Sequence, residues 1–242
     1  MLKLIDKIKN KARDNDNYPG ITIAFLGDSI TQGCFEFYFK DDGNVETIFD
    51  QEHAYCRYLA RILGRLYPSV PFSMINAGVS GGTAPHGLAR LQRDVLSHNP
   101  DLVVVCFGLN DAAGGPDKLS CYTQALTEIF LQIQSTGAEV IFMTPNTANT
   151  TVDCRTEPAF REISRGNAQR QNSGITDRYM EAAKKLCVDM QIPVCDCYAR
   201  WKQIELCGVN IAELHSGYMI HPARDTNWLF AITLAETMLG IL

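Results

Sequence analysis

Short apolar runs alternate along the chain with segments in which apolar residues recur at helical spacing. The runs are rich in β-branched residues and are bounded by turn residues, which is typical of strands. Because strands that alternate with helices form βαβ units, the pattern predicts an α/β fold built on a parallel sheet. Five strands are predicted, at residues 21–26, 72–76, 102–107, 139–144 and 193–196.

Apolar positions spaced by three and four residues predict helices between these strands. Tyr55, Leu59 and Leu63, for example, fall on one face of a helix. The predicted helices lie near residues 55–66, 88–95, 119–133, 177–190 and 224–239.

The first 19 residues predict a separate short helix and a turn. Leu2, Ile5 and Ile8 lie at helical spacing among several lysines, and the polar segment 14–20 ends the pattern. A basic amphipathic helix can bind a membrane surface. We favour the alternative that this helix docks its apolar edge on the rest of the domain.

No internal repeat and no linker-like segment divides the 242 residues, so we expect one domain spanning residues 1–242. One stretch stands apart from the strand and helix pattern. Residues 145–174 are polar, contain four arginines and show little periodicity, which predicts a long loop. Such a loop would be a lid, a wall of a substrate site or a subunit contact, and disorder is the alternative.

Composition narrows the classes of partner. Apolar residues make up 46% of the chain and charged residues 20%, which is typical of globular proteins. The net charge of −5 and the lack of a basic face argue against nucleic acid. The apolar runs are too short to cross a membrane, and no export signal is visible. An odd number of scattered cysteines, nine, suggests free thiols and a cytoplasmic location.

Candidate chemistry gathers directly after the predicted strands, where ligands bind to open parallel sheets. Ser29 follows the first strand and is a candidate nucleophile, and His221 begins the last helix and is a candidate base. Oxyanion stabilisation needs preorganised donors. The backbone amides of Ser29 and Gly81 and the side-chain amide of Asn110 are the candidates, because glycine permits close approach of the main chain.

Four segments in this order resemble the conserved blocks of the SGNH hydrolases, also called the GDSL lipase and esterase family, over residues 21–225. The resemblance implies a flavodoxin-like three-layer α/β/α fold, the SGNH hydrolase fold. It also implies ester hydrolysis through an acyl-serine intermediate, with no cofactor and no metal. The segments are Gly27-Asp28-Ser29 with the nucleophile, Asn76 to Gly81 with an oxyanion glycine, Gly108 to Asp111 with the oxyanion Asn110, and His221-Pro222 with the base.

One position departs from the family pattern. The family commonly has Asp three residues before the catalytic His, where this chain has Tyr218. An orienting acid fixes the imidazole tautomer and stabilises the imidazolium. Glu213 or Asp225 could replace it, but we favour orientation by a main-chain carbonyl or an unassisted Ser-His dyad.

Two other motifs compete with this interpretation. Ser80 lies in a G-x-S-x-G pattern after a strand, which is the nucleophile elbow of other hydrolases. We rank it below Ser29, because it leaves the remaining blocks unexplained. Cys195 and Cys197 are spaced too closely for a usual zinc site, which favours a strand end. The other histidines, expected in surface or cap positions, are His53, His86, His98 and His215.

The predicted activity is hydrolysis of a small acyl ester, with deacetylation of an acetylated carbohydrate as the favoured case. An SGNH thioesterase or lysophospholipase is the alternative within the family. A non-catalytic flavodoxin-like module that binds an anion at residues 27–33 is the alternative outside it. The expected partner is a small ester substrate, and self-association into a homo-oligomer remains open.

Overall fold

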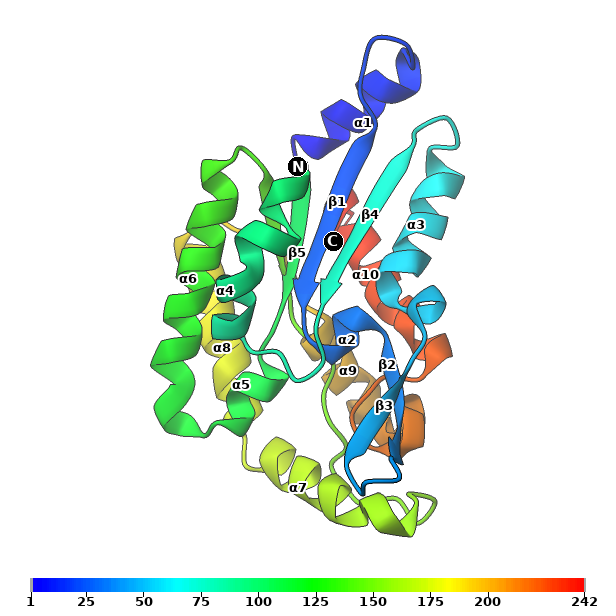
Figure 1. Cartoon of the computed structure of the whole chain (residues 1–242), viewed down its shortest axis with the longest axis vertical. Helices are drawn as coiled ribbons and strands as arrows, with labels where there is room; N and C mark the ends of the chain where they lie inside the picture. The colour runs from blue at the N-terminus through cyan, green and yellow to red at the C-terminus, as the bar shows by residue number, and fades with distance from the viewer. Residues whose placement is uncertain (1, 242) are drawn as a thin grey trace.

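The computed structural model describes residues 2–241 and is built on a five-stranded sheet (Figure 1). The strands lie in the order β4-β1-β5-β6-β7, and every neighbouring pair is parallel. This confirms the predicted α/β fold with five parallel strands. The strands are β1 (Ile21–Gly27), β4 (Phe72–Gly78), β5 (Leu102–Cys106), β6 (Glu139–Met143) and β7 (Val194–Cys195).

Helices cover both faces of the sheet, which gives three layers (Figure 1). Alternate residues of β5 separate the two cores, since Val104 packs with one cluster and Val103 and Val105 with the other. One face carries α1 (Leu4–Arg13), α3 (Tyr55–Leu66), α9 (Cys197–Leu206) and α10 (Asn227–Leu239). The other carries α4 (Ala84–Asp94), α6 (Leu119–Ser135) and α8 (Ile175–Asp189).

A two-stranded antiparallel hairpin that the sequence analysis missed lies outside the main sheet. It consists of β2 (Cys34–Phe39) and β3 (Val45–Phe49), and it projects beside the carboxyl ends of the central strands (Figure 1). The Asp42-Gly43 pair between two runs of aromatic and β-branched residues is a hairpin signal that would have located it. Gly43 has φ +81°, as the turn requires.

The segment 145–174 is not one long loop, because it contains the helix α7 (Arg161–Asn172). The prediction was wrong for a physical reason. The buried face of α7 repeats at helical spacing, but it is mostly polar and therefore left no apolar pattern. The buried residues of this face are Ser164, Asn167, Ala168 and Gln171.

Two short helices, α2 (Ser29–Gln32) and α5 (Leu109–Ala113), start just after β1 and β5 at the same edge of the sheet. Within residues 2–241 no helix is both long enough and apolar enough to cross a membrane.

Candidate active site

The turn after β1 places Ser29 at the edge of the sheet. Asp28 caps α2 by accepting a hydrogen bond from Ile30 N at 3.0 Å, and Ser29 is the first residue of that helix. Gly27 is needed before them, because a Cβ there would overlap Thr31 Oγ1 and approach Cys106 O to 2.9 Å. The tight turn leaves Ser29 8% exposed at the wall of a pocket.

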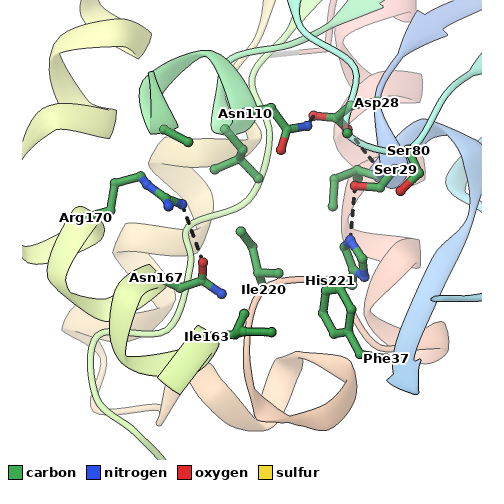
Figure 2. Close-up of a pocket in the computed structure, with 14 residues that line it drawn as sticks. Asp28, Ser29, Phe37, Ser80, Asn110, Ile163, Asn167, Arg170, Ile220 and His221 are labelled. Carbon is green, nitrogen blue, oxygen red and sulfur yellow. Dashed lines mark hydrogen bonds between the residues drawn. The ribbon is translucent and has the colours of Figure 1, made fainter. Parts of the chain in front are cut away.

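His221 comes from the other end of the chain and meets Ser29 there. The Ser29 hydroxyl lies 3.0 Å from His221 Nε2 (Figure 2). The Nδ1–H of His221 donates to the carbonyl oxygen of Phe35 in β2, at 2.8 Å. This bond fixes the tautomer in which Nε2 has a free lone pair, so Nε2 can accept the hydroxyl proton.

The carbonyl of Phe35 therefore occupies the place of an orienting acid, which is one of the alternatives that the sequence left open. Tyr218 stacks under the guanidinium of Arg155, 4.5 Å from it, and Glu213 pairs with the same guanidinium at 2.8 Å. Asp225 lies in a 3-10 turn before α10 and makes no hydrogen bond to the imidazole. The hairpin missed by the sequence analysis thus supplies the group that orients His221.

Burial sets the charge of this imidazole. His221 is 5% exposed, and Phe37 stacks on its ring with centroids 4.8 Å apart. Burial lowers the pKa of His221 from 6.5 to about 4, with a smaller opposing effect from the bond to Phe35. The imidazole is therefore neutral at pH 7 and ready to accept a proton.

The pKa of the neighbouring Asp28 carboxyl is shifted upward. Burial of the carboxyl is the main cause, and together with the charge of Asp111 it raises the pKa from 3.8 to about 7. Its Oδ2 accepts a long hydrogen bond, 3.4 Å, from Asn110 Nδ2. Asp28 is thus a helix cap and a member of the hydrogen-bond network beside Ser29.

The three expected oxyanion donors line the same pocket. Gly81 has φ +73°, and its N–H makes no hydrogen bond within residues 2–241. Asn110 Nδ2 donates to Gly82 O at 3.0 Å, and its second N–H is held only by the long bond to Asp28. That second N–H is the more weakly held of the two, which makes it the candidate donor to a substrate oxygen.

The competing serine, Ser80, also lines the pocket but lacks a base. Its side chain is exposed, and no histidine of residues 2–241 hydrogen-bonds to it. Its backbone N–H donates to Gln32 Oε1 at 2.6 Å. The single Ser-His hydrogen bond in this pocket belongs to Ser29.

Two residues that sequence reasoning left without a role face this site from α7. The pocket has a volume of about 270 Å³, and Asn167 and Arg170 form the wall opposite Ser29 and His221 (Figure 2). Apolar side chains line the pocket as well: Ile163 lies on the α7 side, Phe37 lies against His221, and Ile220 lies between them (Figure 2). The polar periodicity of α7 was the signal that would have indicated this wall.

His215 is not at the surface, which corrects the expectation from sequence. It is 3% exposed and stacks on Trp201 with centroids 5.2 Å apart. Burial lowers its pKa to about 3, so it is a neutral core residue. Cys195 ends β7 and Cys197 begins α9, and within residues 2–241 no group of three or more acidic, His or Cys side chains is arranged to hold a metal ion.

Comparison with known proteins shows which family and which relatives this chain resembles. Residues 25–227 match the model of the GDSL-like lipase/acylhydrolase family. An acetylxylan esterase of Geobacillus stearothermophilus is 28% identical over 135 residues, which are 52% of this chain and 60% of that protein. An arylesterase of Vibrio mimicus is 39% identical over 72 residues, 29% of this chain and 35% of that one. The matches thus span less than two thirds of both curated relatives.

The fold also has a counterpart of known structure. The crystal structure of the acetylxylan esterase from Geobacillus stearothermophilus superposes with a TM-score of 0.66 at 21% identity, covering 90% of this chain and 94% of that one. At this identity the likeness concerns the fold, and it confirms the three-layer arrangement.

Proposed function

Because the chain belongs to the GDSL-like lipase/acylhydrolase family, we propose that it is a serine esterase that cleaves a small acyl ester through an acyl-serine intermediate. The observation that carries the proposal is the 3.0 Å contact between Ser29 Oγ and His221 Nε2 inside a pocket. A serine hydroxyl becomes an effective nucleophile when a base lies within hydrogen-bond reach.

The reaction has two halves. His221 Nε2 accepts the proton of Ser29 as Oγ attacks the ester carbonyl, and the oxyanion is held by the N–H groups of Ser29, Gly81 and Asn110. His221 then protonates the leaving alcohol, and the acyl group remains on Ser29. In the second half a water gives its proton to His221 and attacks the acyl-serine, which releases the acid and restores the hydroxyl.

A carbonyl in place of a carboxylate supplies only one of the two functions of the acid in a catalytic triad. In a Ser-His-Asp triad the acid fixes the tautomer and also stabilises the imidazolium. Phe35 O fixes the tautomer, because it accepts only from a protonated Nδ1. It carries no full charge, so the imidazolium is less favoured, in line with the lowered pKa of His221.

An acetyl ester of a carbohydrate is the substrate class that we propose. The pocket volume of about 270 Å³ lies below the roughly 300–1,000 Å³ of sites for drug-sized ligands, which favours a small acyl group. Its far wall is polar, as a sugar requires. The resemblance to proteins described as acetylxylan esterases supports the same class.

Acetate release tests the proposal. The wild-type enzyme is expected to hydrolyse 4-nitrophenyl acetate and acetylated xylo-oligosaccharides, and to lose rate as the acyl chain of the nitrophenyl ester lengthens. Ser29→Ala and His221→Ala should each reduce kcat by about 10³-fold or more, because members of a nucleophile-base pair act as a unit. Ser80→Ala is the matched control and should keep wild-type activity. A Ser29→Ala variant that is folded and fully active would refute the mechanism.

A further inference from the structure

Arg170 is a guanidinium without a counterion at the wall of the pocket. Its side chain is half-buried, and within residues 2–241 no carboxylate lies within 4 Å of it. Its one side-chain hydrogen bond is donated by Nη1 to Asn167 Oδ1, at 3.4 Å. Two other arginines of the segment differ, since Arg165 pairs with Glu162 and Arg155 with Asp153.

Asn167 adds a second donor that has no acceptor. The residue is 7% exposed, and its Nδ2 is buried without a hydrogen-bond partner in the described chain. The bond from Arg170 holds Oδ1, which leaves Nδ2 as the unpartnered end of an amide that lines the pocket (Figure 2). A buried donor without a partner is costly, and native proteins seldom keep one unless a ligand or water satisfies it.

Partial burial of the guanidinium carries a cost of the same kind. Desolvation lowers the pKa of Arg170 below its usual value, yet an arginine stays protonated in a protein. The wall therefore presents one positive charge and several N–H donors, and the neighbouring side chains offer it no negative charge. The chain as a whole carries −5, so this local cation is the feature that would admit an anion to the pocket.

We propose that Arg170 and Asn167 bind a carboxylate carried by the alcohol part of the ester, so that the substrate is an acetylated sugar acid. The inference rests on the proposed esterase function. The two residues face Ser29 and His221 across the pocket, so an ester whose acetyl group reaches Ser29 would direct its alcohol part toward them (Figure 2).

A carboxylate suits this wall better than a phosphate does. Guanidinium and carboxylate pair through two parallel hydrogen bonds, and the single charge of Arg170 neutralises a monoanion. A phosphate monoester carries about −1.5 to −2 at pH 7 and would keep an uncompensated charge in a half-buried site.

A pair of substrates that differ at one group tests the assignment. An O-acetylated methyl glucuronoside and its glucuronamide counterpart present carboxylate and carboxamide in the same place. The wild type is expected to favour the acid by about 10- to 100-fold in kcat/KM, mostly through KM, as a charge-assisted pair would give. Arg170→Gln should bring the ratio of the two kcat/KM values close to one.

Two further variants keep the test decisive if Arg170→Gln folds poorly. Asn167→Asp is nearly isosteric and supplies the missing counterion, so it should also abolish the preference. Arg165→Gln on the same helix is the matched control and should keep the wild-type ratio. A wild-type ratio near one, or an unchanged ratio in Arg170→Gln and Asn167→Asp, overturns the inference while leaving the esterase function intact.

Binding without hydrolysis separates the two proposals. Calorimetric titration of Ser29→Ala with methyl glucuronoside, the deacetylated product, should show binding that the added Arg170→Gln change weakens about 10-fold or more. If the acid binds in this way but the wild type hydrolyses neither ester, the proposed esterase reaction is wrong and the carboxylate site stands. If the acid and its amide bind equally, the proposed carboxylate site is wrong.

Discussion

Removal of the Phe37 ring is predicted to shift the acid limb of the pH–rate profile to higher pH. The limb of kcat/KM reports the pKa of the essential base in the free enzyme. Burial lowers the pKa of His221 from 6.5 to about 4, and the stacked Phe37 ring is part of what excludes water from it. In the proposed mechanism the neutral imidazole is the active form, so activity should be lost as the pH falls through this pKa. In Phe37→Ala the pKa should rise toward 6.5.

The size of the effect follows from the pKa of His221 when it is buried, about 4, and its value when it is fully solvated, 6.5. At pH 5 an imidazole with a pKa of about 4 is about 90% neutral, whereas one at 6.5 is about 3% neutral. The ratio of kcat/KM at pH 5 to that at pH 8 should therefore fall by up to roughly 30-fold in Phe37→Ala. Hydrolysis of 4-nitrophenyl acetate between pH 4 and 9 measures the limb, with circular dichroism at each pH to show that the protein is folded.

Phe39→Ala is the control for this experiment. Phe39 lies on the same strand, is 45% exposed and stacks on Phe160 with centroids 4.7 Å apart. Its removal should leave the limb in place. A wild-type limb near pH 6.5, or a limb that Phe37→Ala does not move, would refute the reasoning that burial sets the charge of His221.

Three further changes give distinct outcomes. Asn110→Ala should lower kcat by about 10²- to 10³-fold with little change in KM, the usual effect of losing an oxyanion donor, as steady-state kinetics will show. Asp28 has a pKa raised from 3.8 to about 7, so the stability it contributes is present below about pH 4 and is lost as the pH rises through 7. The free energy of unfolding of Asp28→Asn minus that of wild type should therefore be higher at pH 8 than at pH 4, by up to roughly 4 kcal/mol. Urea titrations at the two pH values measure this difference, and the same value at both would contradict the prediction. Gly27→Ala should lower the free energy of unfolding by about 3 kcal/mol, because the new methyl meets Thr31 and Cys106.

The centre of the main sheet could be predicted because β1, β5 and β6 are buried on both faces. Such strands appear in a sequence as continuous apolar runs, and residues 102–106 are the clearest example. The hairpin β2–β3 does not share this property, because it is half exposed and pairs only with itself. The helix α7 escaped prediction because its buried face is polar.

The site was predictable only in part for a related reason. Strand ends and turn residues located Ser29, Gly81 and Asn110, because side chains after parallel strands gather at one edge of the sheet. The group that orients His221 is a main-chain carbonyl, which every residue carries, so no side-chain pattern could identify Phe35. The wall formed by α7 was missed for a different reason: its side chains belong to a helix whose buried face is mostly polar, so the helix itself was not predicted.

Covalent labelling of the nucleophile tests the central claim most directly. A fluorophosphonate probe forms a bond with an activated serine oxygen and releases fluoride, and peptide mass spectrometry identifies the serine. We expect one adduct, on Ser29, that is absent in Ser29→Ala, strongly slowed in His221→Ala and unchanged in Ser80→Ala. An adduct on Ser80, or no adduct on the folded wild-type protein, would contradict the account.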